Sequence, residues 1–271
     1  MFFIFVSAAF GLVFGSFFNV LIRRLPKKES LCFPASHCPH CKRPIKPWEN
    51  IPLVSFMLLS GKCAGCKAPI SFLYPFVEAL TGICAIVVYV FYIAPQCTAS
   101  SSLWHIAATL LQTAVLMVLI PVAIIDIHEF IIPDSITLPG LVLGIIVSLL
   151  PGHPTPLESI LGIAAGGGSL FFIGLLGERI FKKGEAMGGG DVKLMAMCGA
   201  FFGWEISLMA IFLAALLGSL VGIVLLVKGR LSSANNKIPF GPFLALGMWV
   251  AVCWGDFFIK AYIGQMDRLL G

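Results

Sequence analysis

Charged residues are scarce in this chain, and acidic residues are the scarcer of the two kinds. Asp, Glu, Lys and Arg make up 11% of the 271 residues, with 18 basic and 13 acidic side chains. Soluble domains carry about 25% charged residues. Hydrophobic residues account for 59% of the chain, and the mean hydropathy is +0.99. This composition excludes an ordinary soluble domain and favours a chain that crosses a lipid bilayer.

No positive charge precedes the first apolar run, which covers residues 2–22. Basic residues follow it at once: Arg23, Arg24, Lys27 and Lys28. A secretory signal peptide carries its positive charges in front of the apolar run. We therefore expect residues 2–22 to be a membrane anchor whose N-terminus lies outside the cytoplasm.

Lys and Arg are also absent from the loops near 95–103 and 151–157, whereas residues 23–72 hold nine of the eighteen. The loops near 178–190 and 228–239 are basic again, through Arg179, Lys182, Lys183, Lys228, Arg230 and Lys237. This alternation follows the positive-inside rule and puts residues 23–72 in the cytoplasm. The C-terminal tail, with Lys260 and Arg268, is a mild exception.

Seven more apolar segments follow the first, near 73–94, 104–125, 136–151, 158–177, 191–203, 205–227 and 240–258. The sequence predicts an all-α polytopic membrane protein with about eight transmembrane helices and a small cytoplasmic zinc-knuckle loop domain. The expected parts are a first helix (1–22), the loop domain (23–72) and a seven-helix core (73–271). The segment 191–203 is short for a bilayer, so we expect its end to line a protein-walled or wet cavity.

The stretch Gly188-Gly189-Gly190-Asp191 opens one of these segments. Glycine permits positive φ and a close approach of backbones. A carboxylate at the mouth of a membrane segment is costly and is a functional candidate. The alternative is that Asp191 only caps the following helix, but capping does not explain three consecutive glycines.

A second acidic cluster contains Asp126 and Asp134, and the expected topology puts it on the same cytoplasmic side as Asp191. Two close carboxylates do not both ionise readily, so one serves as general acid and the other as general base. Such a pair can activate water against a peptide bond. The alternative is that Asp126 and Asp134 are hydrated interfacial charges. For Asp134, after Pro133, helix capping is an equal alternative.

The basic loop contains two cysteine pairs, Cys38-Pro39-His40-Cys41 and, 21 residues later, Cys63-Ala64-Gly65-Cys66. This spacing is typical of a four-thiolate zinc site, whose closed coordination indicates a structural role. A redox-active dithiol is the alternative, but it needs only one pair. The other five cysteines have no paired spacing.

Glu78 lies inside the second apolar segment, near Tyr74 and Pro75. An intramembrane carboxylate usually has a partner in the bundle. Glu78 is expected to pair with Arg23 or Arg24, or to contact a substrate, and the sequence leaves both open.

These ordered motifs resemble the bacterial type IV prepilin peptidases over nearly the whole chain. The resemblance comprises Gly15-Ser16-Phe17-Phe18-Asn19-Val20 with Arg24-Leu25-Pro26, the cysteine pairs, Trp48-Glu49-Asn50-Ile51-Pro52 with Ser55, Tyr74-Pro75 with Glu78, Asp126 to Asp134, Gly188-x-Gly190-Asp191 with Lys193, and Ile238-Pro239-Phe240-Gly241-Pro242. The glycine–aspartate motif alone also occurs in presenilin-like intramembrane proteases. One departure is Gly189, where relatives often carry a larger residue.

The resemblance implies an aspartic endopeptidase and N-methyltransferase of the bacterial inner membrane. Such enzymes cut a basic leader from type IV prepilins or pseudopilins and then methylate the new amine with S-adenosylmethionine. The catalytic aspartates map onto Asp126 and Asp191, and the zinc ligands onto Cys38, Cys41, Cys63 and Cys66. Asp134, Gly188, Gly190, Lys193 and Glu78 match supporting positions, and Gly61 matches a position linked to methylation. No glycine-rich nucleotide fingerprint is visible, so the cofactor site stays open.

The expected partners are prepilin or pseudopilin substrates, membrane lipid, and a pilus or type II secretion machinery; we expect no nucleic acid. Two other interpretations remain: a zinc-stabilised scaffold of a secretion machine, and a cation or proton-coupled transporter that uses Asp126 and Asp191 as relay groups. No internal repeat is visible, which disfavours an inverted-repeat transporter.

Overall fold

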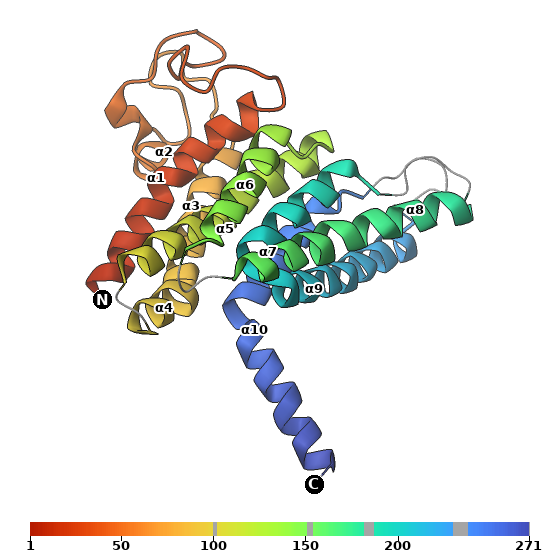
Figure 1. Ribbon diagram of the computed structural model, residues 1–271. Coiled ribbons are helices and arrows are strands. Elements are labelled where there is room, and N and C mark those ends of the chain that lie inside the picture. Colours follow the sequence, from red (N-terminus) through yellow and green to blue (C-terminus); the bar gives the residue numbers. More distant parts are fainter. Residues whose placement is uncertain (100–101, 151–153, 182–186, 230–237, 271) are drawn as a thin grey trace. The chain divides into compact units, whose positions relative to one another are not determined.

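The computed structural model describes residues 1–99, 102–150, 154–181, 187–229 and 238–270. Within these ranges the chain is helical, and its only extended pairings are two isolated bridges, His37 with Pro44 and Lys62 with Pro69. The all-α prediction is therefore confirmed. Contacts divide the chain into two compact units, Met1–Val90 and Phe91–Gly271 (Figure 1). This division differs from the three segments expected from the sequence, since α3 joins the first unit.

The first unit consists of α1 (Phe2–Arg24), η1 (Pro47–Asn50), α2 (Val54–Leu58) and α3 (Leu73–Val88). α1 and α3 pack closely because glycines of α1 face α3. A side chain at Gly15 would place its Cβ 2.7 Å from the Glu78 Cα, and one at Gly11 would lie 2.7 Å from the Thr81 carbonyl oxygen. The chain between α1 and α3 folds at the C-terminal end of α1 (Figure 1). The expected loop domain is thus held by two closely packed helices.

The second unit contains α4 (Ala94–Ala99), α5 (Leu103–Glu129), α6 (Asp134–Val147), α7 (Pro156–Ile163), η3 (Ala164–Gly168), α8 (Ser169–Phe181), α9 (Gly189–Val227) and α10 (Gly241–Leu270). The π-helical turn η2 (Tyr89–Ile93) lies at the border between the units. α9 is central, because α6, α7, η3 and α10 all pack on it (Figure 1). The contact with α7 needs glycine on both helices, since a Cβ on Gly162 or Gly199 would lie 2.1 Å from the other residue's carbonyl oxygen.

The eight expected membrane segments are accounted for within the described residues. Five helices are long and apolar enough to span a bilayer: Phe2–Arg24, Leu73–Cys97, Leu103–Glu129, Pro156–Ile180 and Gly189–Val227. Two shorter apolar helices, Asp134–Val147 and Gly241–Gly255, add two more. The eighth arises because Gly189–Val227 contains a break at Gly203 and so holds both 191–203 and 205–227. The chain is a multi-pass membrane protein.

The break at Gly203 explains the short segment. Gly203 has φ 79° and ψ 179°, a conformation open to glycine and strained for other residues. Beside it, the Phe201 carbonyl accepts a hydrogen bond from Gln112 Nε2 at 2.8 Å, and the Ala200 carbonyl accepts one from Ser159 Oγ at 2.9 Å. Tyr92 in turn donates to Gln112 Oε1. Polar backbone groups at a membrane helix break need such partners.

The orientation expected from the basic loops stays a prediction. Lys182, Lys183, Arg230 and Lys237, which support it, lie outside the described residues.

Gln112→Leu should destabilise the second unit, because the Phe201 carbonyl loses its buried donor. Hydrogen bonds of this kind contribute about 0.5–2 kcal/mol in membrane proteins, so we expect a melting temperature in detergent that is lower by a few degrees. Thr113→Val is the matched control, since the Thr113 hydroxyl bonds to the Thr109 carbonyl of its own helix. Equal melting temperatures for Gln112→Leu and the wild type would contradict this account of the break.

Candidate functional site

Asp126 lies one turn before the C-terminal end of α5. The helix ends at Phe130, whose φ of 55° is left-handed and whose N–H bonds to the Asp126 carbonyl. The Asp126 side chain is 6% exposed, and its Oδ2 accepts a hydrogen bond from the Gly241 N–H at 2.9 Å. A side chain at position 241 would place its Cβ 2.6 Å from that oxygen. Gly241, at the start of α10, is therefore required for this contact.

Asp191 is the third residue of α9, and Gly188 is the residue that precedes the helix. Gly188 is the N-cap of this helix, so the capping interpretation of Asp191 is wrong. Asp191 is 8% exposed, and its buried Oδ1 has no hydrogen-bond partner among the described residues. A buried acceptor without a partner is costly, so Asp191 is a candidate functional residue.

The three glycines before Asp191 do not have the same role. A Cβ on Gly188 would lie 2.7 Å from Asp191 Oδ2, and a Cβ on Gly190 would lie 2.8 Å from the Ile132 Cβ. Gly189 has nothing within 4 Å. Gly188 has φ −67°, and neither Gly189 nor Gly190 has a positive φ. Close approach therefore requires glycine at 188 and 190, while Gly189 is free to change.

The structure brings Asp126 and Asp191 together within the second unit. Their carboxylates are close enough for their charges to interact. Like charges repel, so two carboxylates that interact in this way are not readily ionised together. A role for this pair in acid–base chemistry stays a prediction.

Asp134 has a different partner. It is the first residue of α6, and both its carboxylate oxygens lie 2.8 Å from the Lys193 Nζ in the first turn of α9. Both side chains are exposed. The ion pair joins the start of α6 to the turn that carries Asp191, which is consistent with a supporting position.

The four paired cysteines converge in the first unit. Their Sγ atoms all lie within 4.8 Å of one another, and those of Cys38 and Cys66 are 3.9 Å apart. In a tetrahedral zinc site with bonds of about 2.3 Å, the sulfur atoms lie about 3.8 Å apart. The donor set and its spacing therefore fit a metal ion.

The two cysteine pairs have the same backbone structure. Lys42 and Lys67 both have φ 59°, and their N–H groups bond to the carbonyls of Cys38 and Cys63 at 2.9 and 3.0 Å. The sequence carries a signal for this that the pairing of cysteines alone does not use: Cys-x-x-Cys-Lys-x-Pro-Ile occurs at both 38–45 and 63–70. A short local repeat thus builds the two halves of the metal site.

Backbone N–H groups point at the cysteine sulfurs. Hydrogen bonds from the N–H groups of Cys41 and His40 lower the pKa of Cys38 to about 6, and those of Cys66 and Gly65 lower the pKa of Cys63. Although the Ala68 N–H favours the Cys66 thiolate, burial and the neighbouring thiols raise the pKa of Cys66 to about 11. Stabilised thiolates are what a metal ion binds.

Glu49 ties the segment between the two pairs to the metal site. Its Oε1 lies 2.5 Å from Arg43 Nη2, and its Oε2 accepts the Lys46 N–H at 3.2 Å. The hydrogen bond from Arg43 lowers the pKa of the Glu49 carboxyl. This gives Trp48-Glu49-Asn50 a structural role beside the cysteines.

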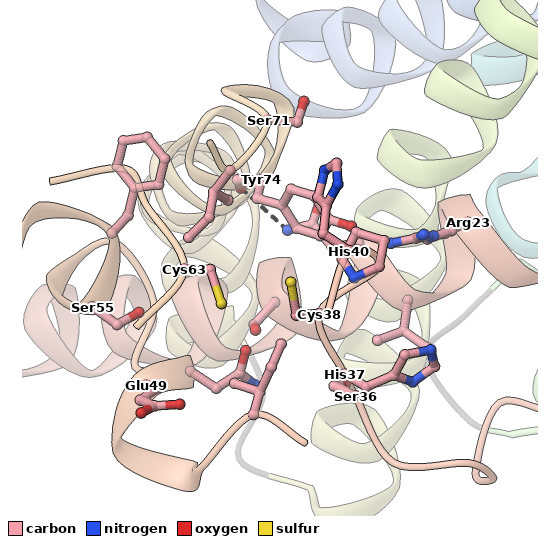
Figure 2. A pocket seen from close by; sticks show the side chains of 18 of the residues that line it. Arg23, Ser36, His37, Cys38, His40, Glu49, Ser55, Cys63, Ser71 and Tyr74 are labelled. Carbon is pink, nitrogen blue, oxygen red and sulfur yellow. Dashed lines mark hydrogen bonds between the residues drawn. The ribbon is translucent and has the colours of Figure 1, made fainter. Parts of the chain in front are cut away.

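A cavity of about 700 Å³ lies in the first unit, and Cys38 and Cys63 form part of its wall (Figure 2). Polar and charged side chains surround it, among them Arg23, His37, His40, Glu49 and Tyr74. Its size is that of a small-molecule pocket. Phe56 and Leu59 of the α2 region also line it.

Glu78 lines this cavity, but the expected pairing with an arginine is not what holds it. Its Oε2 accepts the Leu53 N–H at 2.8 Å. Arg23 donates to the Tyr74 hydroxyl, and Arg24 donates to the carbonyls of residues 30, 31 and 34.

Gly61 does not line the cavity. Its φ is 68°, and its carbonyl accepts the Ile70 N–H at 2.7 Å in the second cysteine pair. A substitution at Gly61 therefore acts first on the backbone of the metal site. Its link to methylation stays a prediction.

Two family models match the chain. Residues 9–92 match the bacterial peptidase A24 N-terminal domain, and residues 113–223 match the type IV leader peptidase family. Proteins named prepilin leader peptidase/N-methyltransferase match over nearly the full length. The protein of Pseudomonas aeruginosa is 34% identical and covers 96% of this chain and 93% of its own length. That of Aeromonas hydrophila is 37% identical, over 94% of this chain and 91% of its own. That of Legionella pneumophila is 33% identical, over 96% of this chain and 94% of its own.

This chain belongs to the type IV leader peptidase family. No solved structure gives a significant match. The N-terminal family region contains the four cysteines and all the residues that line the cavity, and the second contains Asp126, Asp134 and Asp191.

Gly190→Ala should impair the site, whereas Gly189→Ala should not. The added methyl group at 190 would collide with Ile132 and shift the turn that carries Asp191, while the same group at 189 meets open space. We expect Gly189→Ala to keep the wild-type melting temperature and cleavage rate. Gly190→Ala should lose about 10-fold or more in cleavage, the scale of a small misplacement in an active site. Equal effects of the two variants would refute this difference.

Proposed function

We propose that this chain is a membrane aspartic endopeptidase that removes the leader from type IV prepilins or pseudopilins and then methylates the new N-terminal amine. The observation that carries the peptidase function is the buried pair Asp126 and Asp191 within the second unit. Relatives with the name prepilin leader peptidase/N-methyltransferase support both activities. The substrates proposed for this chain follow from that name.

Cleavage uses the two carboxylates and a water molecule. One carboxylate takes a proton from the water as the water oxygen attacks the scissile carbonyl carbon. The other, which starts as the carboxylic acid, donates a proton to the amine as the C–N bond breaks. The Gly241 N–H fixes the orientation of Asp126. Asp191 Oδ1, which is buried and has no partner among the described residues, lacks the donor that a water or the substrate would supply.

The proposed location is the bacterial inner membrane, with the N-terminus outside and the cysteine loop and both aspartates on the cytoplasmic side. The excess of Lys and Arg in residues 23–72 supports this orientation. Membrane lipid surrounds the apolar helices, and a pilus or type II secretion machinery receives the product.

We propose that the metal held by Cys38, Cys41, Cys63 and Cys66 is zinc. Four thiolates leave no open coordination position, so the ion would stabilise the loop rather than act on the substrate. The loop has no β-sheet and little helix among its described residues, and a metal ion supplies the stability that a larger core would give.

Methyl transfer is proposed for the cavity in the first unit, with S-adenosylmethionine as the methyl donor. The methionine part of this cofactor carries a carboxylate and an ammonium group, and the cavity wall offers Arg23 and Arg24 as cations and Glu49 and Glu78 as anions. Phe56 and Tyr74 are aromatic surfaces against which an adenine ring packs. Separate units would then carry the two reactions.

Asp126→Asn and Asp191→Asn should each reduce leader cleavage by about 10²–10⁴-fold, the usual contribution of general acid–base catalysis. Asparagine keeps the size of the side chain but neither takes nor supplies the proton. Glu129→Gln, which removes an exposed acidic group at the end of α5, is the matched control and should cleave normally. Cleavage would be followed with a purified prepilin in detergent. Near-normal cleavage by either asparagine variant would exclude this mechanism.

The purified, reduced protein should contain about one zinc ion per chain, as expected for one four-thiolate site. Cys38→Ser should lower the zinc content and expose the loop to limited proteolysis, because metal binding and folding of such loops are coupled. Cys32→Ser removes an exposed cysteine of the same loop outside the cluster and should keep both properties. Zinc-free protein that resists proteolysis as well as the zinc-loaded form would overturn the structural role.

A further inference from the structure

Three carboxylates line the cavity of the first unit: those of Glu29, Glu49 and Glu78. Glu29 is exposed, so water can solvate its charge. Glu49 is neutralised by Arg43 at 2.5 Å. Glu78 is only 8% exposed, so water does little to solvate its charge. It also takes part in neither of the ion pairs found among the described residues.

Two neutral groups donate hydrogen bonds to the Glu78 carboxylate. The Leu53 N–H donates to Oε2 at 2.8 Å, and the Ser16 hydroxyl contributes a second hydrogen bond. Within the described residues the ion pairs are Arg43–Glu49 and Lys193–Asp134, so Glu78 has no basic partner there. The guanidinium groups of Arg23 and Arg24 bond to Tyr74 and to loop carbonyls instead.

A buried carboxylate without a cationic partner is costly to a fold. The cost to stability is small when a bound ligand supplies the missing positive charge. Glu78 borders a cavity large enough for a small molecule, and such a cavity holds ligands by a few well-placed polar groups. The group that would complete this site is a cation with N–H donors.

We propose that Glu78 binds the α-ammonium group of a methyl-transfer reactant in this cavity. This inference rests on the methyltransferase function proposed above. Both reactants carry such a group, namely the new N-terminus of the cleaved pilin and the methionine part of S-adenosylmethionine. Both would place a positive charge against the Glu78 carboxylate.

A purely structural role for Glu78 is the main alternative. Leu53 has a φ of 60°, an unfavourable conformation for a side-chain-bearing residue, and its N–H bonds to Glu78. Glu78→Gln separates the two roles, because the glutamine oxygen still accepts the Leu53 N–H while the negative charge is lost. Glu29→Gln removes a charge from the same cavity wall without touching a buried group.

Ligand binding to the purified full-length protein in detergent tests the proposal by isothermal titration calorimetry. The first pair of probes is S-adenosylhomocysteine and 5′-methylthioadenosine, which lacks the amino-acid part. The second pair is a peptide with the mature pilin N-terminus and its N-acetylated form. Charge-assisted hydrogen bonds are the strong ones, so losing the one to Glu78 should weaken binding about 10- to 100-fold.

Glu78→Gln should weaken the binding of one amine-bearing probe by this factor and leave the affinity for its amine-free counterpart unchanged. The pair of probes that is affected identifies the reactant. Glu29→Gln should bind all four probes as the wild type does, and the melting temperature of Glu78→Gln should stay within a few degrees of the wild type. Wild-type affinities of Glu78→Gln for both amine-bearing probes would overturn the proposal, as would equal weakening of the amine-free probes. A wild-type protein that methylates no pilin would instead contradict the methyltransferase function itself.

Discussion

A carboxylate buried among apolar helices needs a partner from the protein, and the hydrogen bond from the Gly241 N–H to Asp126 meets this need in the second unit. It joins the end of α5 to the start of α10 and requires glycine at 241. Asp191, in contrast, has an oxygen for which the described residues supply no donor. The pair is therefore asymmetric: Asp126 accepts a backbone hydrogen bond, and Asp191 has a buried oxygen without a donor among the described residues.

The helices that carry this pair are held by close backbone approach. α9 contacts its neighbours through glycine and small side chains, as at Gly162 against Gly199, and glycine at 190 lets Ile132 approach the turn of Asp191. Association of helices in lipid depends on such packing, because the lipid chains are as apolar as the side chains. Polar side chains such as Gln112 and Ser159 then satisfy the carbonyls beside the break at Gly203.

Much of this arrangement was readable in the sequence, because charge and hydropathy in a membrane protein are tightly constrained. The apolar segments and the cysteine cluster follow from hydropathy and spacing, and the interaction of Asp126 with Asp191 agrees with the equal depth expected for them. The partner of Glu78 did not follow, since a backbone N–H at Leu53 leaves no mark in composition. Nor did the difference between Gly189 and Gly190, which depends on where Ile132 packs. The matching backbone of the two cysteine pairs, in contrast, has its mark in the sequence as the repeated Cys-x-x-Cys-Lys-x-Pro-Ile pattern.

The central claim is that Asp126 and Asp191 act as one catalytic unit, and a double-mutant cycle tests it most directly. The kcat/KM for prepilin cleavage would be measured for the wild type, Asp126→Asn, Asp191→Asn and the double variant. Residues that act as a unit are strongly non-additive, so the account predicts that the double variant is about as slow as either single variant. A double variant whose loss equals the product of the two single losses would contradict it.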